Sequence, residues 1–185
     1  MKDNINKDIQ EVLIDSKVID DKVKNLARRI NRDFAGKNPV LISILKGSIV
    51  FLSDLMKYLD IESSIDFIAV SSYEGDTESS GVVKLVMDLR ESIEDRHVII
   101  VEDIIDTGLT MAYLRDNFLT RKPASFNICS LLYKPENNEV NIDIDYLGFE
   151  IPDKFVVGYG LDYREKYRNL PYLGTLKPKI YRKES

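Results

Sequence analysis

The sequence contains one cysteine and one histidine, which limits the chemistry that these side chains can supply. A single cysteine excludes an internal disulfide. Cys129 lies in an apolar run, where a small buried residue is a better interpretation than a nucleophile. His97 has no cysteine or histidine beside it, so the sequence gives little support to a metal site built on these residues.

The sequence also lacks a concentrated run of lysine and arginine and an apolar leader. It has 26 basic and 31 acidic residues, a net charge of −5, whereas nucleic-acid-binding surfaces are normally basic. The first eight residues mix charges, so no signal peptide is evident. We therefore expect a soluble cytoplasmic protein with no nucleic-acid partner and no membrane partner.

Segments with strand patterns alternate with segments that have helical spacing of apolar residues. The predicted strands are 40–45, 65–70, 82–89, 98–101, 126–133, 146–149 and 155–157. The predicted helices carry apolar residues over 23–34, 49–59 and 111–118, and Asp20 or Asp21 is the expected N-cap of the first. This alternation predicts an α/β fold with a mostly parallel sheet, and 185 residues suit one domain or one core with a small lobe.

Residues 98–110 are the most informative part of the chain. The β-branched run 98–101 stops at two adjacent carboxylates, Glu102 and Asp103, and is typical of a buried parallel strand. In parallel sheets, ligands bind beyond the carboxyl ends of the strands, so both acids are placed near a ligand. Because neighbouring side chains on a strand point to opposite faces, both can serve one ligand only at the strand's edge.

The Asp-Thr-Gly-x-Thr segment that follows is a candidate phosphate site. Gly108 allows several backbone N–H groups to converge on one anion, and Thr107 and Thr110 add hydroxyl donors. A helix begins nearby, and a helix N-terminus favours phosphate. No GxxxxGK[ST] motif is present, so the loop suits a single terminal phosphate, with the acids placed for sugar hydroxyls. The alternative is an ordinary strand–turn–helix with solvated acids.

The apolar strand, acid pair and Asp-Thr-Gly-x-Thr together resemble the phosphoribosyl-pyrophosphate signature of the type I phosphoribosyltransferases. The resemblance spans roughly residues 11–178 and is closest to the bacterial hypoxanthine-guanine branch of the family. It implies a mostly parallel twisted sheet flanked by helices, a small hood lobe from the terminal segments and a mobile flap. The whole chain, 1–185, would be one domain, with a core of roughly 36–150 and a hood from the N-terminal segment and roughly 151–185.

The resemblance also implies roles for the signature residues. The 5′-phosphate and ribose of the substrate would be bound by Glu102, Asp103, Asp106, Thr107, Gly108, Leu109 and Thr110. Asp106 is the candidate general base, because a carboxylate there can accept a purine ring proton. The implied cofactor is Mg²⁺, held by Glu102, Asp103 and Asp162.

A second anion site is expected at Leu45-Lys46-Gly47, at the end of the first core strand and therefore at the same edge of the sheet. A strand-end Lys-Gly can offer backbone N–H groups to an anion, although a plain helix-entry turn has the same pattern. By the resemblance, pyrophosphate is bound by Lys46, Gly47, Arg168, Ser72 and Tyr73. The guanidinium of an arginine suits this role, and the polar segment 71–81 corresponds to the mobile flap.

The purine site is expected at Lys134 and in the segment 155–163. An ammonium has three donors and no acceptor, so Lys134 suits the 6-oxo group of hypoxanthine or guanine and opposes the 6-amino group of adenine. A solvated lysine before Pro135 is the alternative. An aromatic such as Phe155 can stack on a flat base. By the resemblance, the purine is bound by Lys134, Phe155, Val156 and Asp162.

These features predict a purine-salvage enzyme that transfers the 5-phosphoribosyl group of phosphoribosyl pyrophosphate to N9 of hypoxanthine or guanine, giving IMP or GMP and pyrophosphate. Three alternatives remain open: a transferase for another base, a regulator that senses phosphoribosyl pyrophosphate and binds nucleic acid, and a sugar-phosphate binder without turnover. The acidic composition opposes the regulator. The expected partners are these small molecules, and the resemblance implies a homodimer or homotetramer.

Overall fold

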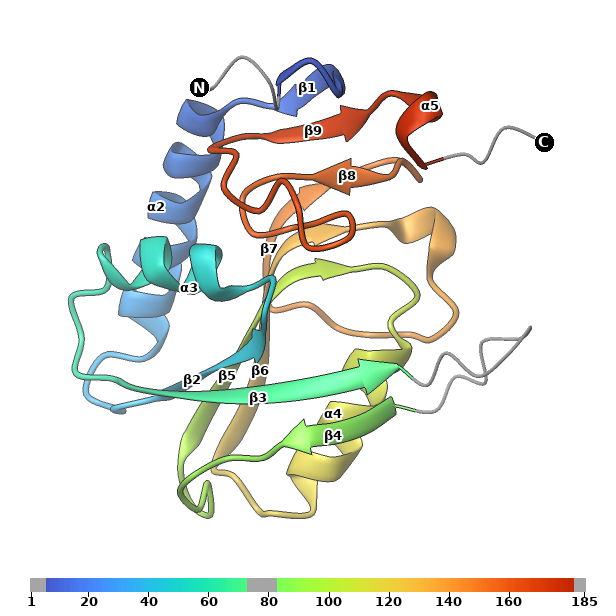
Figure 1. The fold of residues 1–185 in the computed structure, drawn as a ribbon. Helices are drawn as coiled ribbons and strands as arrows, with labels where there is room; N and C mark the ends of the chain where they lie inside the picture. Colours follow the sequence, from blue (N-terminus) through green and yellow to red (C-terminus); the bar gives the residue numbers. More distant parts are fainter. Residues whose placement is uncertain (1–5, 73–82, 182–185) are drawn as a thin grey trace.

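The computed structural model describes residues 6–72 and 83–181, which form a larger and a smaller β-sheet (Figure 1). The larger sheet has six strands in the order β4-β3-β2-β5-β6-β7. Their bounds are β2 Val40–Leu45, β3 Ser64–Ser72, β4 Val83–Met87, β5 His97–Ile105, β6 Ser125–Tyr133 and β7 Tyr146–Glu150. Neighbouring strands are parallel except β3 and β4, which are antiparallel. The predicted α/β fold with a mostly parallel sheet is confirmed.

Helices cover both faces of the larger sheet. The helices are α2 Ser16–Asp33, α3 Ile49–Met56, α4 Leu109–Leu119 and α5 Pro178–Tyr181, and Pro135–Asn137 forms a short 3₁₀ helix. Ile99 and Val101 of β5 share a buried cluster with α2 and α3, whereas Val98 and Ile100 share one with α4. Alternate residues of one apolar strand therefore serve two cores, which explains why the run has no polar face.

Three predicted boundaries are wrong. Helix α2 begins earlier than expected, because Asp15 is its N-cap: its backbone is extended and its carboxylate accepts a hydrogen bond from the N–H of Lys17 at 2.8 Å. Strand β5 does not stop at the acid pair but continues to Ile105, because its ladder with β6 continues through Ile105, which pairs with Tyr133. Helix α3 ends at Met56, before the predicted limit at residue 59.

A smaller sheet, which we call the hood, lies over the carboxyl ends of the core strands (Figure 1). It consists of β1 Ile9–Ile14, β9 Leu173–Leu176 and β8 Val156–Val157, in that order, and all its pairs are antiparallel. The two ends of the chain thus pair in one sheet, as the predicted hood from terminal segments requires. β1 and β9 were not predicted, and the division of the chain into domain parts stays a prediction.

Candidate active site

Near the end of β5, Asp103 is buried and the adjacent Glu102 is half-buried. Asp103 is 8% exposed, and burial raises its pKa to about 6 even though the backbone N–H groups of Asp103 and Ile104 oppose this rise. Burial also raises the pKa of Glu102 well above its usual value, and the charge of Asp103 adds to the effect. Oε2 of Glu102 is buried with no hydrogen-bond partner among the described residues. Such an oxygen is suited to a cation or to a hydroxyl donor from a ligand.

The turn after β2 packs directly against Asp103. A Cβ atom on Gly47 would overlap the Asp103 carboxylate, and a Cβ on Gly160 would overlap the carbonyl oxygen of Gly47. Gly160 has φ +102°, which glycine adopts at no steric cost. The peptide bond between Leu45 and Lys46 is cis. The predicted anion-binding turn, Asp103 and the segment between β8 and β9 therefore meet at one point, at the sheet edge that the turn was predicted to share with the acids.

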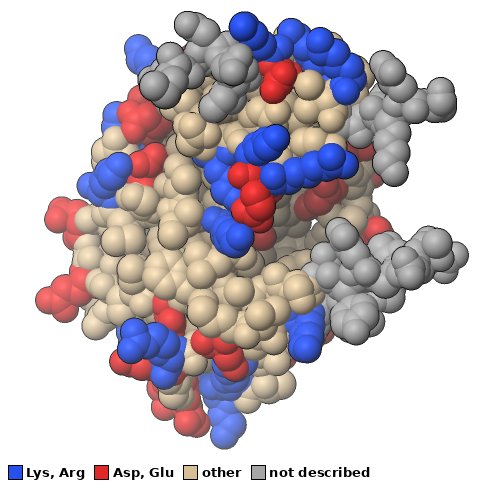
Figure 2. Space-filling model, viewed as in Figure 1, with Lys and Arg blue, Asp and Glu red and all other residues tan. Residues whose placement is uncertain are grey.

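Charged side chains from the hood segment and the β2 turn lie together at this point. A guanidinium nitrogen of Arg168, Nη2, is 2.8 Å from Oδ1 of Asp162, and Nη1 donates to the carbonyl of Gly160 at 2.8 Å. Oε1 of Glu165 lies 3.2 Å from the Lys46 ammonium and 3.5 Å from Arg168 Nη2. Figure 2 shows this face hollowed between the hood and the larger sheet, with basic and acidic side chains at the rim. Lys46 and Arg168, the two cations among the predicted pyrophosphate ligands, thus share the Glu165 carboxylate, which sequence reasoning missed.

The Asp-Thr-Gly-x-Thr loop lies between β5 and α4. Gly108 has φ +83° and is the N-cap of α4, so a left-handed residue starts the helix. A Cβ on Gly108 would lie 2.8 Å from Oδ1 of Asn138 and 2.9 Å from a methyl carbon of Val140, which leaves no space for a larger residue. A cavity of about 120 Å³ is lined by Glu102, Ile104, Ile105, Asp106, Thr107, Gly108, Thr110 and Met111. The predicted loop, helix start and first acid therefore border one cavity.

Asp106 and Lys134 belong to a closed ring of hydrogen bonds. The Lys134 ammonium is 2.8 Å from Oδ2 of Asp106 and 3.2 Å from Oδ1 of Asp153. Nδ2 of Asn137 donates to Oδ1 of Asp106 at 2.7 Å and to Oδ1 of Asp153 at 2.8 Å. Burial lowers the pKa of Lys134, but the hydrogen bonds to both carboxylates outweigh burial and the net direction is upward. Lys134 is therefore a charged ammonium although it is only 7% exposed.

Sequence reasoning did not identify Asn137 and Asp153. Neither lies in a recognisable motif, and they join the site only because the segment after β6 folds back on the loop after β5. Backbone bonds show this: the N–H of Lys134 donates to the Ile105 carbonyl at 3.0 Å, and that of Glu139 to the Thr107 carbonyl at 2.9 Å.

Two of the predicted purine-binding residues, Phe155 and Val156, lie at the start of β8. Phe155 is 43% exposed and stands edge-on to Tyr163, with ring centroids 5.6 Å apart. Val156 is buried in β8. Ser72 ends β3, whereas Tyr73 and most of the predicted flap lie outside the described residues. The roles of Phe155, Val156 and Ser72 stay predictions.

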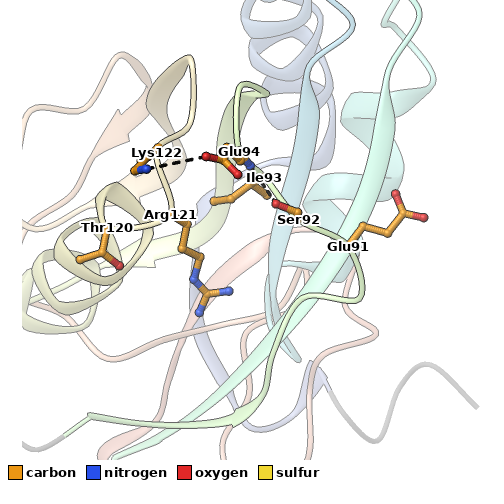
Figure 3. Close-up of a pocket in the computed structure, with 7 residues that line it drawn as sticks. All are labelled: Glu91, Ser92, Ile93, Glu94, Thr120, Arg121 and Lys122. Atoms are coloured by element: carbon orange, nitrogen blue, oxygen red, sulfur yellow. Dashed lines mark hydrogen bonds and ion pairs between the residues drawn. The ribbon is translucent and has the colours of Figure 1, made fainter.

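A larger cavity of about 330 Å³ lies near the opposite, amino-terminal end of β5 (Figure 3). It is lined by residues that precede β5 or follow α4: Glu91, Ser92, Ile93, Glu94, Thr120, Arg121 and Lys122. Its two cations are engaged, Arg121 with Asp88 at 2.7 Å and Lys122 with Glu94 at 3.9 Å. This cavity is therefore separate from the acid pair and offers no unpaired cation to an anion.

Residues 6–72 and 83–181 contain neither a preformed cluster of metal ligands nor a membrane-spanning helix. No three histidine, cysteine, aspartate or glutamate side chains there are grouped so as to hold a metal ion by themselves. No helix in those ranges has the length and apolar character needed to cross a membrane.

The chain is similar to known phosphoribosyltransferases over almost its whole length. A model of the phosphoribosyl transferase domain matches residues 11–164. The hypoxanthine-guanine phosphoribosyltransferase of Streptococcus pneumoniae strain R6 is 51% identical over 177 residues, which cover 96% of this chain and 98% of that protein. The enzyme of the same name from Streptococcus thermophilus strain CNRZ 1066 is 49% identical over 179 residues, 97% and 99% of the two chains.

Solved structures give the same result. A hypoxanthine phosphoribosyltransferase from Staphylococcus aureus matches with a TM-score of 0.92 and 48% identity, over 96% of this chain and 97% of that chain. A hypoxanthine-guanine phosphoribosyltransferase from Bacillus anthracis, with a HEPES molecule in its active site, matches with a TM-score of 0.87 and 47% identity, over 91% and 99%. The resemblance found in the sequence is confirmed, and this chain belongs to the phosphoribosyltransferase family, in its hypoxanthine-guanine branch.

Proposed function

We propose that this chain transfers the 5-phosphoribosyl group of phosphoribosyl pyrophosphate to N9 of hypoxanthine or guanine, giving IMP or GMP and pyrophosphate in purine salvage. The observation that carries the proposal is the pairing of Asp106 with Lys134, 2.8 Å apart, beside the glycine-threonine loop. A carboxylate that can accept a ring proton and an ammonium that can bind a ring carbonyl are the two groups that a 6-oxopurine needs.

In this reaction the bond from C1′ of the ribose to the pyrophosphate oxygen breaks, and the bond from C1′ to N9 forms. Until it accepts the purine ring proton, the Asp106 carboxylate also stabilises the positive charge that develops on the sugar. Residues 107–110 hold the 5′-phosphate through backbone N–H and hydroxyl groups at the start of α4. We assign most of the rate acceleration to the positioning of the two substrates and to the stabilisation of charge in the transition state.

We assign the pyrophosphate to the β2 turn and the hood. Lys46 and Arg168 supply positive charge, and Gly47, which has no side chain, lets the pyrophosphate come close to the backbone. Both cations lie within 3.5 Å of the same Glu165 oxygen, so they can also share one anionic ligand. Ser72 and Tyr73 are proposed to contact pyrophosphate from the flap.

The acid pair and Asp162 fit a magnesium ion. Oε2 of Glu102 is buried and lacks a partner among the described residues, and carboxylate oxygens are the ligands that Mg²⁺ prefers. Mg²⁺ usually retains water and binds through one or two carboxylates and substrate phosphates, so a complete protein cage is not required. When bound, it would neutralise charge on the leaving pyrophosphate. Glu102, Asp103 and Asp162 are the residues assigned to hold it, together with the ribose hydroxyls.

The purine is assigned to Lys134, Phe155, Val156 and Asp162. Lys134 binds the 6-oxo group, and Phe155 stacks on the ring from the hood. The backbone of Val156 contacts the edge of the base, and Asp162 lies toward its two-position. Adenine is rejected because its 6-amino group would face the Lys134 ammonium, donor against donor.

We also propose that the protein acts in the cytoplasm as a homodimer or homotetramer. The exposed apolar side chains of Ile49 and Met56 on α3 and Ile65 on β3 support a contact with a second copy. Figure 2 shows a broad area with few charges on the side where α3 and β3 lie. Light scattering that gives the mass of a single chain at micromolar concentration contradicts this assignment.

The proposed reaction is tested by incubating the purified protein with phosphoribosyl pyrophosphate, Mg²⁺ and hypoxanthine. We expect IMP and pyrophosphate in equal amounts and no product after EDTA is added. Binding of phosphoribosyl pyrophosphate without any product supports the sugar-phosphate binder instead. A gel shift with RNA or DNA that disappears as salt is raised supports the regulator.

A further inference from the structure

The hydrogen-bond ring around Asp106 contains two residues that have no role in the proposed chemistry. Its four bonds run from Lys134 to Asp106, from Asn137 to Asp106, from Asn137 to Asp153 and from Lys134 to Asp153, at 2.7 to 3.2 Å. The four residues come from three separate segments: the loop after β5, the turn after β6 and the stretch before β8. Side chains brought from such different places are held in one geometry only while the ring is intact.

Each oxygen of Asp106 has its own partner in this ring. Oδ2 is paired with the Lys134 ammonium, and Oδ1 accepts from the Asn137 amide. The Oδ1 contact does not involve Lys134, so it still restrains the carboxylate when Lys134 moves. Asp106 is 43% exposed, so little else around its side chain restrains it.

Lys134 likewise has a second carboxylate. If Asp106 were its only partner, binding of a ligand carbonyl would require a buried ammonium to give up its only counter-charge. Asp153 lies 3.2 Å from the ammonium and remains available when the bond to Asp106 is given up. The hydrogen bond from Asn137 and, to a smaller extent, the one from Lys134 lower the pKa of Asp153. Asp153 therefore stays an anion in this arrangement.

We propose that Asn137 and Asp153 are positioning residues of the transferase. They hold Asp106 and Lys134 in a closed ring that opens only at the Asp106–Lys134 contact when a 6-oxopurine binds. Opening there frees one oxygen of Asp106 for the purine ring proton and turns the ammonium toward the 6-oxo group. Asn137 keeps Asp106 in place, and Asp153 keeps Lys134 charged. This inference rests on the proposed function, because it assigns these residues to that reaction.

The first test is Asn137→Ala, with Glu136→Gln as the matched control. Glu136 lies in the same 3₁₀ helix, is exposed and takes no part in the ring. We expect Asn137→Ala to lower kcat about tenfold and to leave the KM for phosphoribosyl pyrophosphate unchanged, because general-base catalysis depends on the position of the carboxylate. The control keeps wild-type kinetics. An equal kcat in the two variants overturns the role of Asn137.

A double-mutant cycle separates positioning from a general loss of structure. If Asn137 acts through Asp106, then Asn137→Ala has no further effect on kcat once Asp106 is already replaced by asparagine. The same tenfold loss in the Asp106→Asn background contradicts the proposal, since it shows that Asn137 acts independently of the base.

Asp153→Asn tests the other half of the ring. We expect kcat/KM for hypoxanthine to fall about tenfold with an unchanged KM for phosphoribosyl pyrophosphate, because Lys134 must then leave its only anionic partner to reach the purine. Circular dichroism and thermal unfolding establish that each variant is folded. Wild-type kinetics with hypoxanthine overturn the role of Asp153, whereas a wild-type protein that makes no nucleotide overturns the proposed function itself.

Discussion

The Lys134 ammonium lies 2.8 Å from the Asp106 carboxylate, although 28 positions separate the two residues in the chain. β5 and β6 are parallel neighbours, so the residues that follow them emerge at the same edge of the sheet. Asp106 supplies a carboxylate, and Lys134 supplies an ammonium that remains charged. The pair therefore places a proton acceptor beside a hydrogen-bond donor for a ligand carbonyl, which is the basis of the proposed activity.

Replacing Asp106 by asparagine removes the proposed general base and preserves the shape of the side chain. We expect kcat to fall by about 10²- to 10⁴-fold, with little change in either KM, because the loss affects proton transfer rather than binding. Single-turnover kinetics with hypoxanthine measure the chemical step directly. Asp116→Asn, an exposed acid on α4, is the control and keeps wild-type rates. An Asp106→Asn variant with the wild-type rate shows that another group accepts the proton.

Replacing Lys134 by glutamine tests the choice of base. A hydrogen bond from a charged group contributes about 1.5–3 kcal/mol, so kcat/KM for hypoxanthine should fall by roughly 10- to 150-fold. A glutamine amide has an acceptor as well as donors, so the preference for hypoxanthine over adenine should also decrease. Lys57→Gln, exposed at the end of α3, is the control. Unchanged selectivity in the Lys134 variant contradicts its assignment to the 6-oxo group.

Replacing Gly47 by alanine should displace Asp103, because the new methyl group overlaps that carboxylate. Overpacking of this kind costs about 1–3 kcal/mol in the free energy of unfolding, and we expect activity to be lost as well. Gly36→Ala is the matched control. Gly36 has φ +72° and no atom within 4 Å of an added Cβ, so that variant loses about 1 kcal/mol of stability and keeps its activity. Urea unfolding and steady-state rates measure both effects, and a fully active Gly47→Ala enzyme contradicts the proposed contact.

The pH dependence of stability should reveal the buried acids. The pKa of Asp103 in the folded protein is about 6, above its usual value of 3.8, so the folded state binds this proton more tightly than the unfolded chain does. The contribution of Asp103 to the free energy of unfolding therefore falls as pH rises from about 4 to about 6, by roughly 3 kcal/mol in all. Glu102, whose pKa is also raised, acts in the same direction.

This effect is measured by comparing the wild type with Asp103→Asn in EDTA. We expect the two proteins to unfold at similar urea concentrations near pH 4 and the variant to be the more stable one near pH 7. The variant should nevertheless be impaired in catalysis, because it has lost a proposed ligand for Mg²⁺. If the two proteins differ by the same free energy of unfolding at both pH values, burial does not raise the pKa of Asp103.

The parts of the site that could be predicted from the sequence are continuous in the chain. The run 98–110 places the acids, the glycine and the helix start in a fixed order, and that order is what the structure shows around Gly108. Lys46-Gly47 was also placed correctly, because a strand-end turn in a parallel sheet must lie at the same edge as the other strand ends. Local pattern and one topological rule were sufficient in both cases.

The parts that could not be predicted depend on contacts between distant segments. Asn137 and Asp153 join the ring only after two loops meet, and nothing beside them in the sequence marks that meeting. The end of β5 was misplaced because two acids resemble a strand terminus, whereas pairing with β6 continues to Ile105. β1 was missed because three of its six residues are exposed, and its partner β9 lies at the other end of the chain.

The most direct test of the proposed activity is a competition among bases. The purified protein is incubated with Mg²⁺, limiting phosphoribosyl pyrophosphate and equal amounts of hypoxanthine, guanine, xanthine and adenine, and the nucleotides are separated by chromatography. We expect IMP and GMP, with no detectable AMP, because Lys134 donates to a 6-oxo group and opposes a 6-amino group. AMP as the main product, or no nucleotide from any base, contradicts it.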